Sequence, residues 1–212
     1  MFLNAPFLNH PFPPPYDQTD YIPNLTSFQN LVTLMNTELP NFSLDPDETA
    51  LYIGREARSG LKLLPGVERL VKHLHRHHIP MAVATGAGRE NYAYGVANFP
   101  DFFATYISHA VCAYDDPEVE RRKPAPDCYL VAARRFATPP ADMSAVVVFE
   151  DSITGLKGAL ACGGQAVFVS SWAAMFTEET RPLRERAALV IDNLEQFKPE
   201  DFGLPPYEQE ED

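Results

Sequence analysis

The fold is decided by the stretch from Val146 to Gly155, which reads VVVFEDSITG. Its four leading apolar residues are typical of a buried strand, and two adjacent carboxylates follow them. Ser152 then offers a helix N-cap, and apolar residues recur at helical spacing up to the glycine pair 163–164. The stretch therefore predicts a strand, a turn that carries Glu150 and Asp151, and a helix. In open α/β sheets, ligands bind at this carboxyl edge of the strands.

Strands and helices alternate on both sides of that stretch. The predicted strands span 79–85, 107–113, 146–149, 166–170 and 188–191, and the predicted helices span 67–74, 127–136 and 152–162, with a further helix from about 89. Strands that alternate with helices in this way are joined by right-handed crossovers and form a parallel sheet. The sequence therefore predicts an α/β core.

The first 62 residues follow a different pattern. Residues 1–24 contain six prolines and no helical or strand period, so we expect them to be extended or disordered. Apolar spacing from Phe28 to Met35, which Pro40 ends, and the N-cap signal Asp45-Pro46-Asp47-Glu48 predict two helices with no strand. The expected divisions are the proline-rich segment 1–24, a helical unit at 25–62, the core at 63–206 and an acidic tail at 207–212.

Composition limits the partners and the compartment. The formal net charge of −12 argues against nucleic acid and anionic membranes, because both would repel the chain. No apolar run approaches the roughly 18 residues of a membrane span. The three cysteines show no metal-type spacing, and the first Lys or Arg is Arg55, so we expect reduced thiols and no secretory or mitochondrial leader. We therefore expect a cytoplasmic protein and a monomer.

Three polar spots follow the predicted strands in order. The loop Thr85-Gly86-Ala87-Gly88 places a hydroxyl and small-residue amides before a helix, which favours an anion such as phosphate. Lys123 lies in a proline-bounded loop, and Glu150-Asp151 offers the hard oxygen ligands that Mg²⁺ takes. Each spot alone is better explained as a glycine turn, a solvated basic loop or a helix cap. Together they predict a phosphate-and-magnesium site.

A second set of polar residues lies in KHLHRHHIP, which contains four histidines. His73 and His77 share a helical face at spacing i, i+4, and such a pair can bind a metal. These residues precede their strand, so they lie at the sheet edge opposite to the three polar spots. We therefore favour a solvated helix end over a metal site.

Three segments resemble motifs of a known family. VATGAG, RRKPAPDCYL and VVFEDSITGLKGALACGG resemble the second, third and fourth motifs of the haloacid dehalogenase-like (HAD) hydrolases. From Leu61 to Tyr207, about two thirds of the chain, the sequence is similar to the eukaryotic pseudouridine-5′-phosphatases of that family. The resemblance implies a HAD-like Rossmannoid parallel sheet with helices on both faces, and makes 25–62 the remnant of a helical cap.

The resemblance also implies roles for the polar spots. Thr85 would hydrogen-bond the transferring phosphoryl group, with Gly86 and Ala87 binding phosphate beside it. Lys123 would balance the charge of the phosphate, and Glu150-Asp151 would bind Mg²⁺ directly or through water. The implied substrate is a small phosphorylated metabolite, and the nearest activity is hydrolysis of pseudouridine 5′-phosphate in nucleotide metabolism.

The N-terminal part departs from the family pattern. Family members begin with an apolar strand ending in Asp-x-Asp, whose first aspartate attacks phosphorus. The nearest candidate here, Asp17-Gln18-Thr19-Asp20, follows Pro13-Pro14-Pro15-Tyr16, which cannot form an interior strand because proline lacks the N–H donor. We therefore expect no nucleophile. Two classes of function stay open: a phosphatase that is weakened or inactive, and a non-catalytic, truncated or degenerate relative that binds a phosphorylated ligand or a protein partner.

The absent first strand also has a structural consequence. In the family it lies between the strands that end at Thr85 and Glu150, so its absence would leave a gap of about 10 Å, two strand spacings. Prolines interrupt residues 1–24, and only Met1 to Ala5 precede the first of them. We therefore expect the two strands to pair directly or the gap to stay unfilled.

Overall fold

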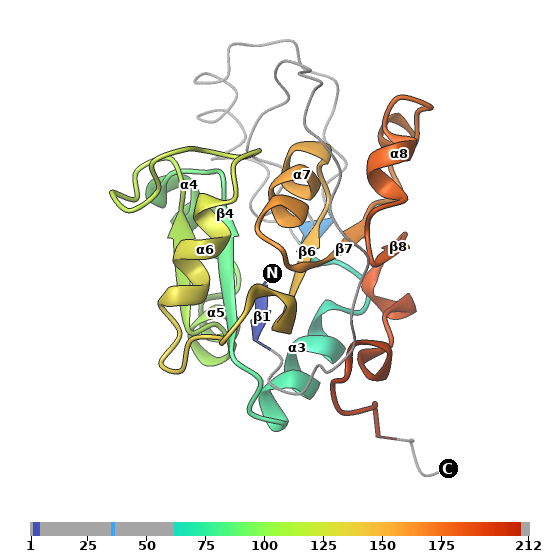
Figure 1. Cartoon of the computed structure of the whole chain (residues 1–212). Helices are drawn as coiled ribbons and strands as arrows, with labels where there is room; N and C mark the ends of the chain where they lie inside the picture. Colours follow the sequence, from blue (N-terminus) through green and yellow to red (C-terminus); the bar gives the residue numbers. More distant parts are fainter. Residues whose placement is uncertain (1, 5–34, 37–61, 209–212) are drawn as a thin grey trace.

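The computed structural model describes residues 2–4, 35–36 and 62–208, which form a six-stranded and a two-stranded sheet. The larger sheet has the strand order β5-β4-β1-β6-β7-β8 and helices on both faces, as predicted (Figure 1). The strands are β1 (Phe2–Asn4), β2 (Met35–Asn36), β3 (Lys62–Leu63), β4 (Met81–Thr85), β5 (His109–Cys112), β6 (Val146–Glu150), β7 (Gln165–Val169) and β8 (Leu189–Ile191). The helices are α3 (Val67–Arg76), α4 (Arg89–Val96), α5 (Pro100–Tyr106), α6 (Asp127–Arg134), α7 (Ile153–Ala161) and α8 (Arg181–Arg184).

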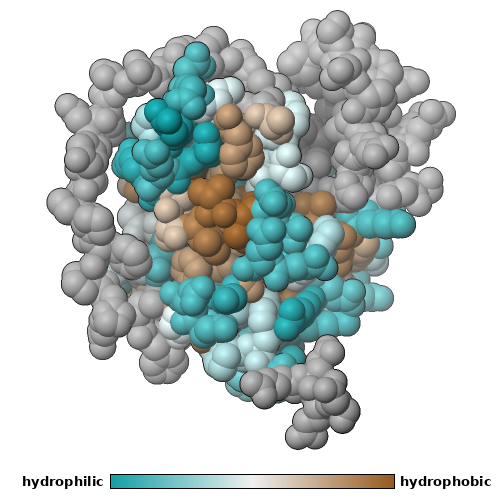
Figure 2. All heavy atoms as spheres, turned by 90° about the vertical axis from the view of Figure 1, so that its right-hand side faces the viewer, coloured by the Kyte–Doolittle hydropathy of each residue, from teal (hydrophilic) through white to brown (hydrophobic). Residues whose placement is uncertain are grey.

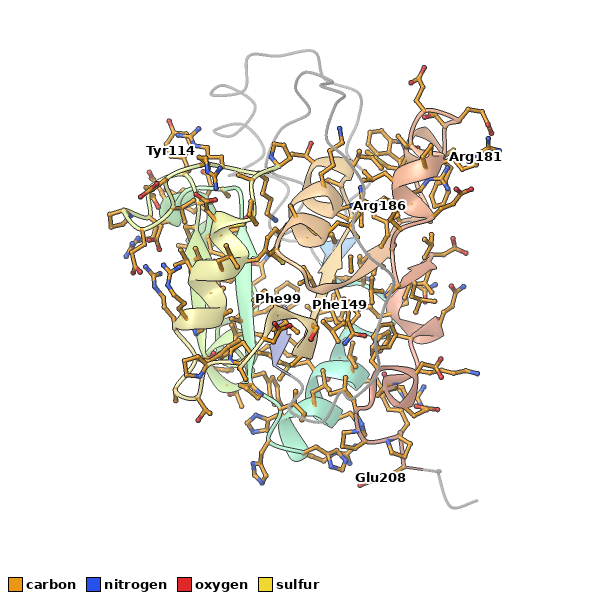
Figure 3. All side chains as sticks on the ribbon, viewed as in Figure 1. Phe99, Tyr114, Phe149, Arg181, Arg186 and Glu208 are labelled. Carbon is orange, nitrogen blue, oxygen red and sulfur yellow. The ribbon has the colours of Figure 1, made fainter. Side chains whose placement is uncertain are left out.

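The larger sheet buries a different set of apolar side chains on each face. All residues of β4 and β6 are buried, and the apolar ones alternate between the two sets. One set packs with α3 and the C-terminal segment, and the other packs with α6 and α7. Phe149 of β6 lies at the centre of the molecule (Figure 3), its ring 4.9 Å from that of Phe197. Burial on both faces explains why this strand is a continuous apolar run instead of an alternating one.

Local signals place the ends of α7 where the sequence predicted them. The Ser152 hydroxyl accepts a hydrogen bond from the Gly155 amide at 3.0 Å, which satisfies one of the free donors at the helix start. Beyond the other end, Gly163 has φ 81°, a left-handed conformation that glycine adopts without steric cost. The turn carrying Glu150 and Asp151 is therefore held between a buried strand and a capped helix.

The gap between β4 and β6 is filled by β1, which corrects our expectation. β1 pairs with both neighbours, with Phe2 opposite Ala82 on one side and opposite Val148 on the other. It runs antiparallel to both, whereas the other described strands of this sheet pair in parallel. The three residues Phe2–Asn4, which precede the first proline, are enough to fill the gap. Their backbone supplies the hydrogen-bond donors and acceptors that the buried edges of β4 and β6 require.

The described part of the N-terminal region differs from the prediction at a second place. Met35–Asn36 form strand β2, paired antiparallel with Lys62–Leu63, where apolar spacing predicted a helix. Long-range pairing has overridden the local helical period at these two residues. The remainder of the two predicted cap helices, and Asp17 and Asp20, lie outside the described residues.

The strands and helices predicted in the core are confirmed within a few residues at their ends, whereas α5 and α8 were not predicted. Cys112, Cys128 and Cys162 are buried and form no disulfide. In the part of the chain that the structure describes, no helix has the length and apolar character needed to cross a membrane. Figure 2 faces the β8 side of the sheet, where apolar side chains gather among hydrophilic ones and Val190 is exposed.

Candidate functional site

The predicted site residues meet at the carboxyl edge of the parallel strands. Thr85 is the last residue of β4 and Glu150 the last of β6, and both strands point to the edge where α4 and α7 begin (Figure 1). Lys123 reaches the same edge from the loop before α6. Asp151 follows Glu150 directly and is half-buried. The sequence therefore predicted correctly that these residues would share one edge, and their functional roles stay predictions.

Lys123 and Glu150 form a buried ion pair at this edge. The Lys123 ammonium lies 2.6 Å from Glu150 Oε1, and the two side chains are 5% and 4% exposed. Burial, the largest single influence, acts to lower the pKa of Lys123, but the Glu150 carboxylate together with Cys128 and Asp151 raises it, so the net pKa is raised and the side chain stays cationic. The pair fixes the ammonium beside the strand ends with Glu150 as its counter-charge, and the balancing of a phosphate by Lys123 stays a prediction.

The same ammonium bridges β4 and β6 beyond the start of β1. The described pairing of β1 with β4 reaches only Ala82, so the later residues of β4 have no partner among the described residues of β1. Thr85 directs its carbonyl to the β5 side, where it accepts from Ala113 N at 2.9 Å. The Ala84 carbonyl accepts instead from Lys123 Nζ at 3.1 Å. Lys123 thus satisfies a backbone acceptor of β4 and holds the carboxylate that ends β6, a structural role that the sequence did not reveal.

Tyr129 and Gly155 belong to this site but were missed in the sequence. The Tyr129 hydroxyl, on α6, lies 2.7 Å from Glu150 Oε1 and 3.0 Å from the Gly155 carbonyl, and the side chain is fully buried. Burial, reinforced by the Glu150 charge, raises the pKa of Tyr129 well above its usual value, so the phenol stays a donor. The only sequence signal was the position of Tyr129 near the start of the predicted helix 127–136, six residues after Lys123.

Gly155 leaves space for the other oxygen of Glu150. A Cβ at residue 155 would lie 1.6 Å from Glu150 Oε2, which no real packing allows. Oε2 is itself buried and has no hydrogen-bond partner among the described residues. Glu150 is thus held on one oxygen by Lys123 and Tyr129 and packed on the other against a glycine.

One donor of the predicted anion loop is used within the loop, and the amide that follows the loop is bound by a carboxylate. Thr85 Oγ1 accepts a hydrogen bond from the Ala87 amide at 3.1 Å, and Thr85 is almost fully buried. The Arg89 amide, at the start of α4, donates to the Asp115 carboxylate at 2.8 Å. A carboxylate therefore already caps this helix and adds negative charge near the loop. Phosphate binding by Thr85, Gly86 and Ala87 remains a prediction.

The carboxylates offer Mg²⁺ few ligands from the described residues. No group of three His, Cys, Asp or Glu side chains with metal-binding geometry occurs in the described ranges. Glu150 Oε1 is held by an ammonium, whereas Asp151 is half-buried at the strand end. Mg²⁺ commonly uses one or two carboxylates, several waters and a substrate phosphate, so Asp151 fits that donor set. Ligation by Glu150, directly or through water, stays a prediction.

Comparison with known sequences identifies relatives of this chain. A model of the family described as haloacid dehalogenase-like hydrolase matches residues 21–163. The (DL)-glycerol-3-phosphatase 2 of Arabidopsis thaliana is 40% identical over 147 residues, 69% of this chain and 58% of that protein. A probable pseudouridine-5′-phosphatase of Drosophila melanogaster is 40% identical over 146 residues, 69% of this chain and 60% of that protein. The chain thus spans less than two thirds of the length of either relative.

Solved structures share the fold at low identity. CbbY from Rhodobacter sphaeroides in complex with phosphate has a TM-score of 0.58 and 19% identity, over 80% of this chain and 74% of that one. A HAD hydrolase of family IA, variant 3, from Entamoeba histolytica has a TM-score of 0.56 and 20% identity, over 75% and 71% of the two chains. At these identities the likeness shows the fold alone.

Proposed function

The chain belongs to the haloacid dehalogenase-like hydrolases, and on that premise we propose that its carboxyl-edge site recognises a small phosphomonoester most like pseudouridine 5′-phosphate. Hydrolysis in this form is weak or absent. The curated relatives named above as phosphatases, for glycerol 3-phosphate and pseudouridine 5′-phosphate, support a small phosphate ester as the ligand class. We further propose a monomer that works in the cytoplasm, in nucleotide metabolism.

The observation that carries the proposal is that Lys123, Glu150 and Asp151 meet at the carboxyl edge of the sheet, where β4 ends with Thr85. A fixed ammonium and carboxylates side by side at the carboxyl edge of the sheet are what a phosphate and its counter-cation require. Mg²⁺, held by Asp151 with waters and a phosphate oxygen, would neutralise charge on the phosphate. Lys123 contributes positive charge on the β4 side, and the Thr85 hydroxyl orients the loop that follows β4.

A second candidate, binding without turnover, is favoured by the direction of β1. A strand that runs antiparallel to β4 and β6 ends at the opposite edge, with Asn4 beside Val146, the first residue of β6. β1 therefore ends at the edge opposite to the one where Lys123 and Glu150 meet. A covalent route needs an attacking group at the carboxyl edge.

One experiment separates the two candidates. Phosphate release from pseudouridine 5′-phosphate and from glycerol 3-phosphate is measured with and without Mg²⁺, for the chain and for Asp151→Asn. We expect release no faster than that of Asp151→Asn, together with saturable binding of pseudouridine 5′-phosphate in calorimetry. Absence of both binding and turnover would refute the proposed function. Magnesium-dependent turnover that disappears in Asp17→Asn or Asp20→Asn would show that the chain is a working phosphatase and would contradict binding without turnover.

A further inference from the structure

A second polar cluster lies at the edge of the sheet opposite to Lys123. We call it the histidine cluster: His73 of α3, His77 at the C-cap of α3, and Tyr207 of the C-terminal segment. The ring centroids of His73 and His77 are 4.7 Å apart, and those of His73 and Tyr207 are 4.8 Å apart. His73 is fully buried, so the expectation of a solvated helix end was wrong for this residue. Sequence spacing placed both histidines on one face but could not show that the C-terminal segment covers it.

Buried polar atoms without partners gather in this cluster. In the described ranges, four buried side-chain N or O atoms have no hydrogen-bond partner, and three of them are His73 Nδ1, His77 Nε2 and Tyr207 Oη. Buried polar groups are normally satisfied, and each exception calls for a cause. Three exceptions on adjacent rings indicate one shared ligand rather than three separate defects.

The hydrogen bond made by Nε2 of His73 determines the protonation state of Nδ1 in the same ring. His73 Nε2 lies 2.8 Å from the Pro205 carbonyl, which can only accept. Nε2 therefore carries the proton, and Nδ1 of the neutral ring presents a lone pair. This is the usual arrangement of a metal-bound histidine, whose other nitrogen donates to a backbone carbonyl or carboxylate. This lone pair can bind a cation or accept a hydrogen bond, but it repels an anion.

Two arginines and one carboxylate of the described residues lie close to the histidine cluster. The Arg69 guanidinium lies 3.9 Å from the Tyr207 ring centroid, and Arg76 pairs with Glu208 at 3.0 Å (Glu208 is labelled near α3 in Figure 3). Glu208 thus offsets the charge of Arg76. No third His, Cys, Asp or Glu completes a metal-binding group among the described residues, so affinity rests on two imidazoles.

We propose that the histidine cluster binds a late first-row divalent cation, Zn²⁺ in the first place, through His73 Nδ1 and His77 Nε2. Water fills the remaining coordination positions, and the Tyr207 hydroxyl hydrogen-bonds one of these waters. Imidazole nitrogen is a preferred ligand of zinc, copper and nickel, whereas Mg²⁺ takes oxygen. The site is separate from Lys123 and Glu150, so it does not depend on the proposed phosphatase function.

The test uses the full chain without a histidine tag, stripped of metal and titrated with Zn²⁺ in a calorimeter. We expect one zinc per chain, loss of that binding in His77→Gln, and weakening of about tenfold in Tyr207→Phe, as for other outer-shell changes. His75→Gln is the matched control, because His75 is exposed on the same helix and should leave binding unchanged. Circular dichroism checks that each variant is folded.

Co²⁺ provides the second readout, because its visible spectrum distinguishes nitrogen from thiolate ligands. We expect a nitrogen-type spectrum that His77→Gln removes and His75→Gln keeps. No zinc binding in the folded chain would overturn the proposal. So would binding that His77→Gln and Tyr207→Phe leave intact, or a thiolate spectrum from one of the three cysteines; a solvated or water-filled cluster would then account for the unpartnered atoms.

Discussion

The ammonium of Lys123 lies 2.6 Å from Oε1 of Glu150, with both side chains nearly inaccessible to solvent. Removing one partner of such a pair leaves an uncompensated buried charge. We expect Lys123→Met to lower the free energy of unfolding by about 3–5 kcal/mol. Lys123→Met with Glu150→Gln should recover much of this loss, because the amide needs no counter-charge. Urea unfolding of the double-mutant cycle measures the coupling, and simply additive changes would contradict it.

Tyr129 should contribute to stability through its contact with the same carboxylate. Tyr129→Phe keeps the ring but removes the donor 2.7 Å from Glu150 Oε1. We expect a loss of about 1.5–3 kcal/mol, the range for a hydrogen bond to a charged group. Tyr94→Phe is the control: its hydroxyl bonds Glu90 at 3.3 Å at the surface, and its change should stay within about 0.5 kcal/mol. Equal effects of the two changes in chemical denaturation would argue against a special role for Tyr129.

Gly155→Ala separates helix propensity from packing. Propensity alone predicts a gain of about 1 kcal/mol, because residue 155 lies inside α7. The new Cβ would meet Glu150 Oε2 at 1.6 Å, so we expect instead a loss of about 1–3 kcal/mol and a displaced carboxylate. In Gly88→Ala the nearest atom is the Asp115 carboxylate oxygen at 3.2 Å, and the thermal midpoint should change little. A more stable Gly155→Ala would show that Glu150 has room to move.

Acid stability should depend on Asp116. Two hydrogen bonds from Arg135, at 2.6 and 2.8 Å, hold the pKa of this buried carboxyl below its usual value of 3.8. A depressed folded-state pKa gives stability that is present above the unfolded value and is lost as the pH falls through the folded one. We expect Asp116→Asn to flatten the fall in unfolding free energy between about pH 5 and about pH 3. Glu118→Gln, at an exposed partner of Arg135, should leave most of that slope in place.

The strand β1 should be needed to protect its neighbours from hydrogen exchange. Leu3 pairs with Met81 on one side and Val147 on the other. Leu3→Pro removes a backbone donor from a strand that has neighbours on both sides. We expect faster amide exchange in β4 and β6 and little change in β8, which pairs with β7 instead. Leu3→Ala controls for the side chain, and unchanged protection in Leu3→Pro would show that β1 does not hold the sheet together.

Sequence patterns were sufficient for the parts of the fold that depend on local order. The apolar run before Glu150 predicted a strand buried on both faces, and Ser152 predicted the start of α7. Both predictions depend only on residues that are adjacent in the sequence. Alternation of strands and helices then placed Thr85, Glu150 and Asp151 at one edge, since parallel strands joined by helical crossovers all point the same way.

Only the tertiary structure decided which groups meet across the chain. Proline spacing argued against entry of residues 1–24 into the sheet, yet β1 fills the gap, because two unpaired strand edges cost more than ordering three residues. The contacts of Tyr129 and Gly155 with Glu150, and the burial of His73 under Pro205, join residues far apart in sequence. Local periodicity reports which face a residue occupies, whereas burial and charge pairing depend on the segment that comes to cover that face.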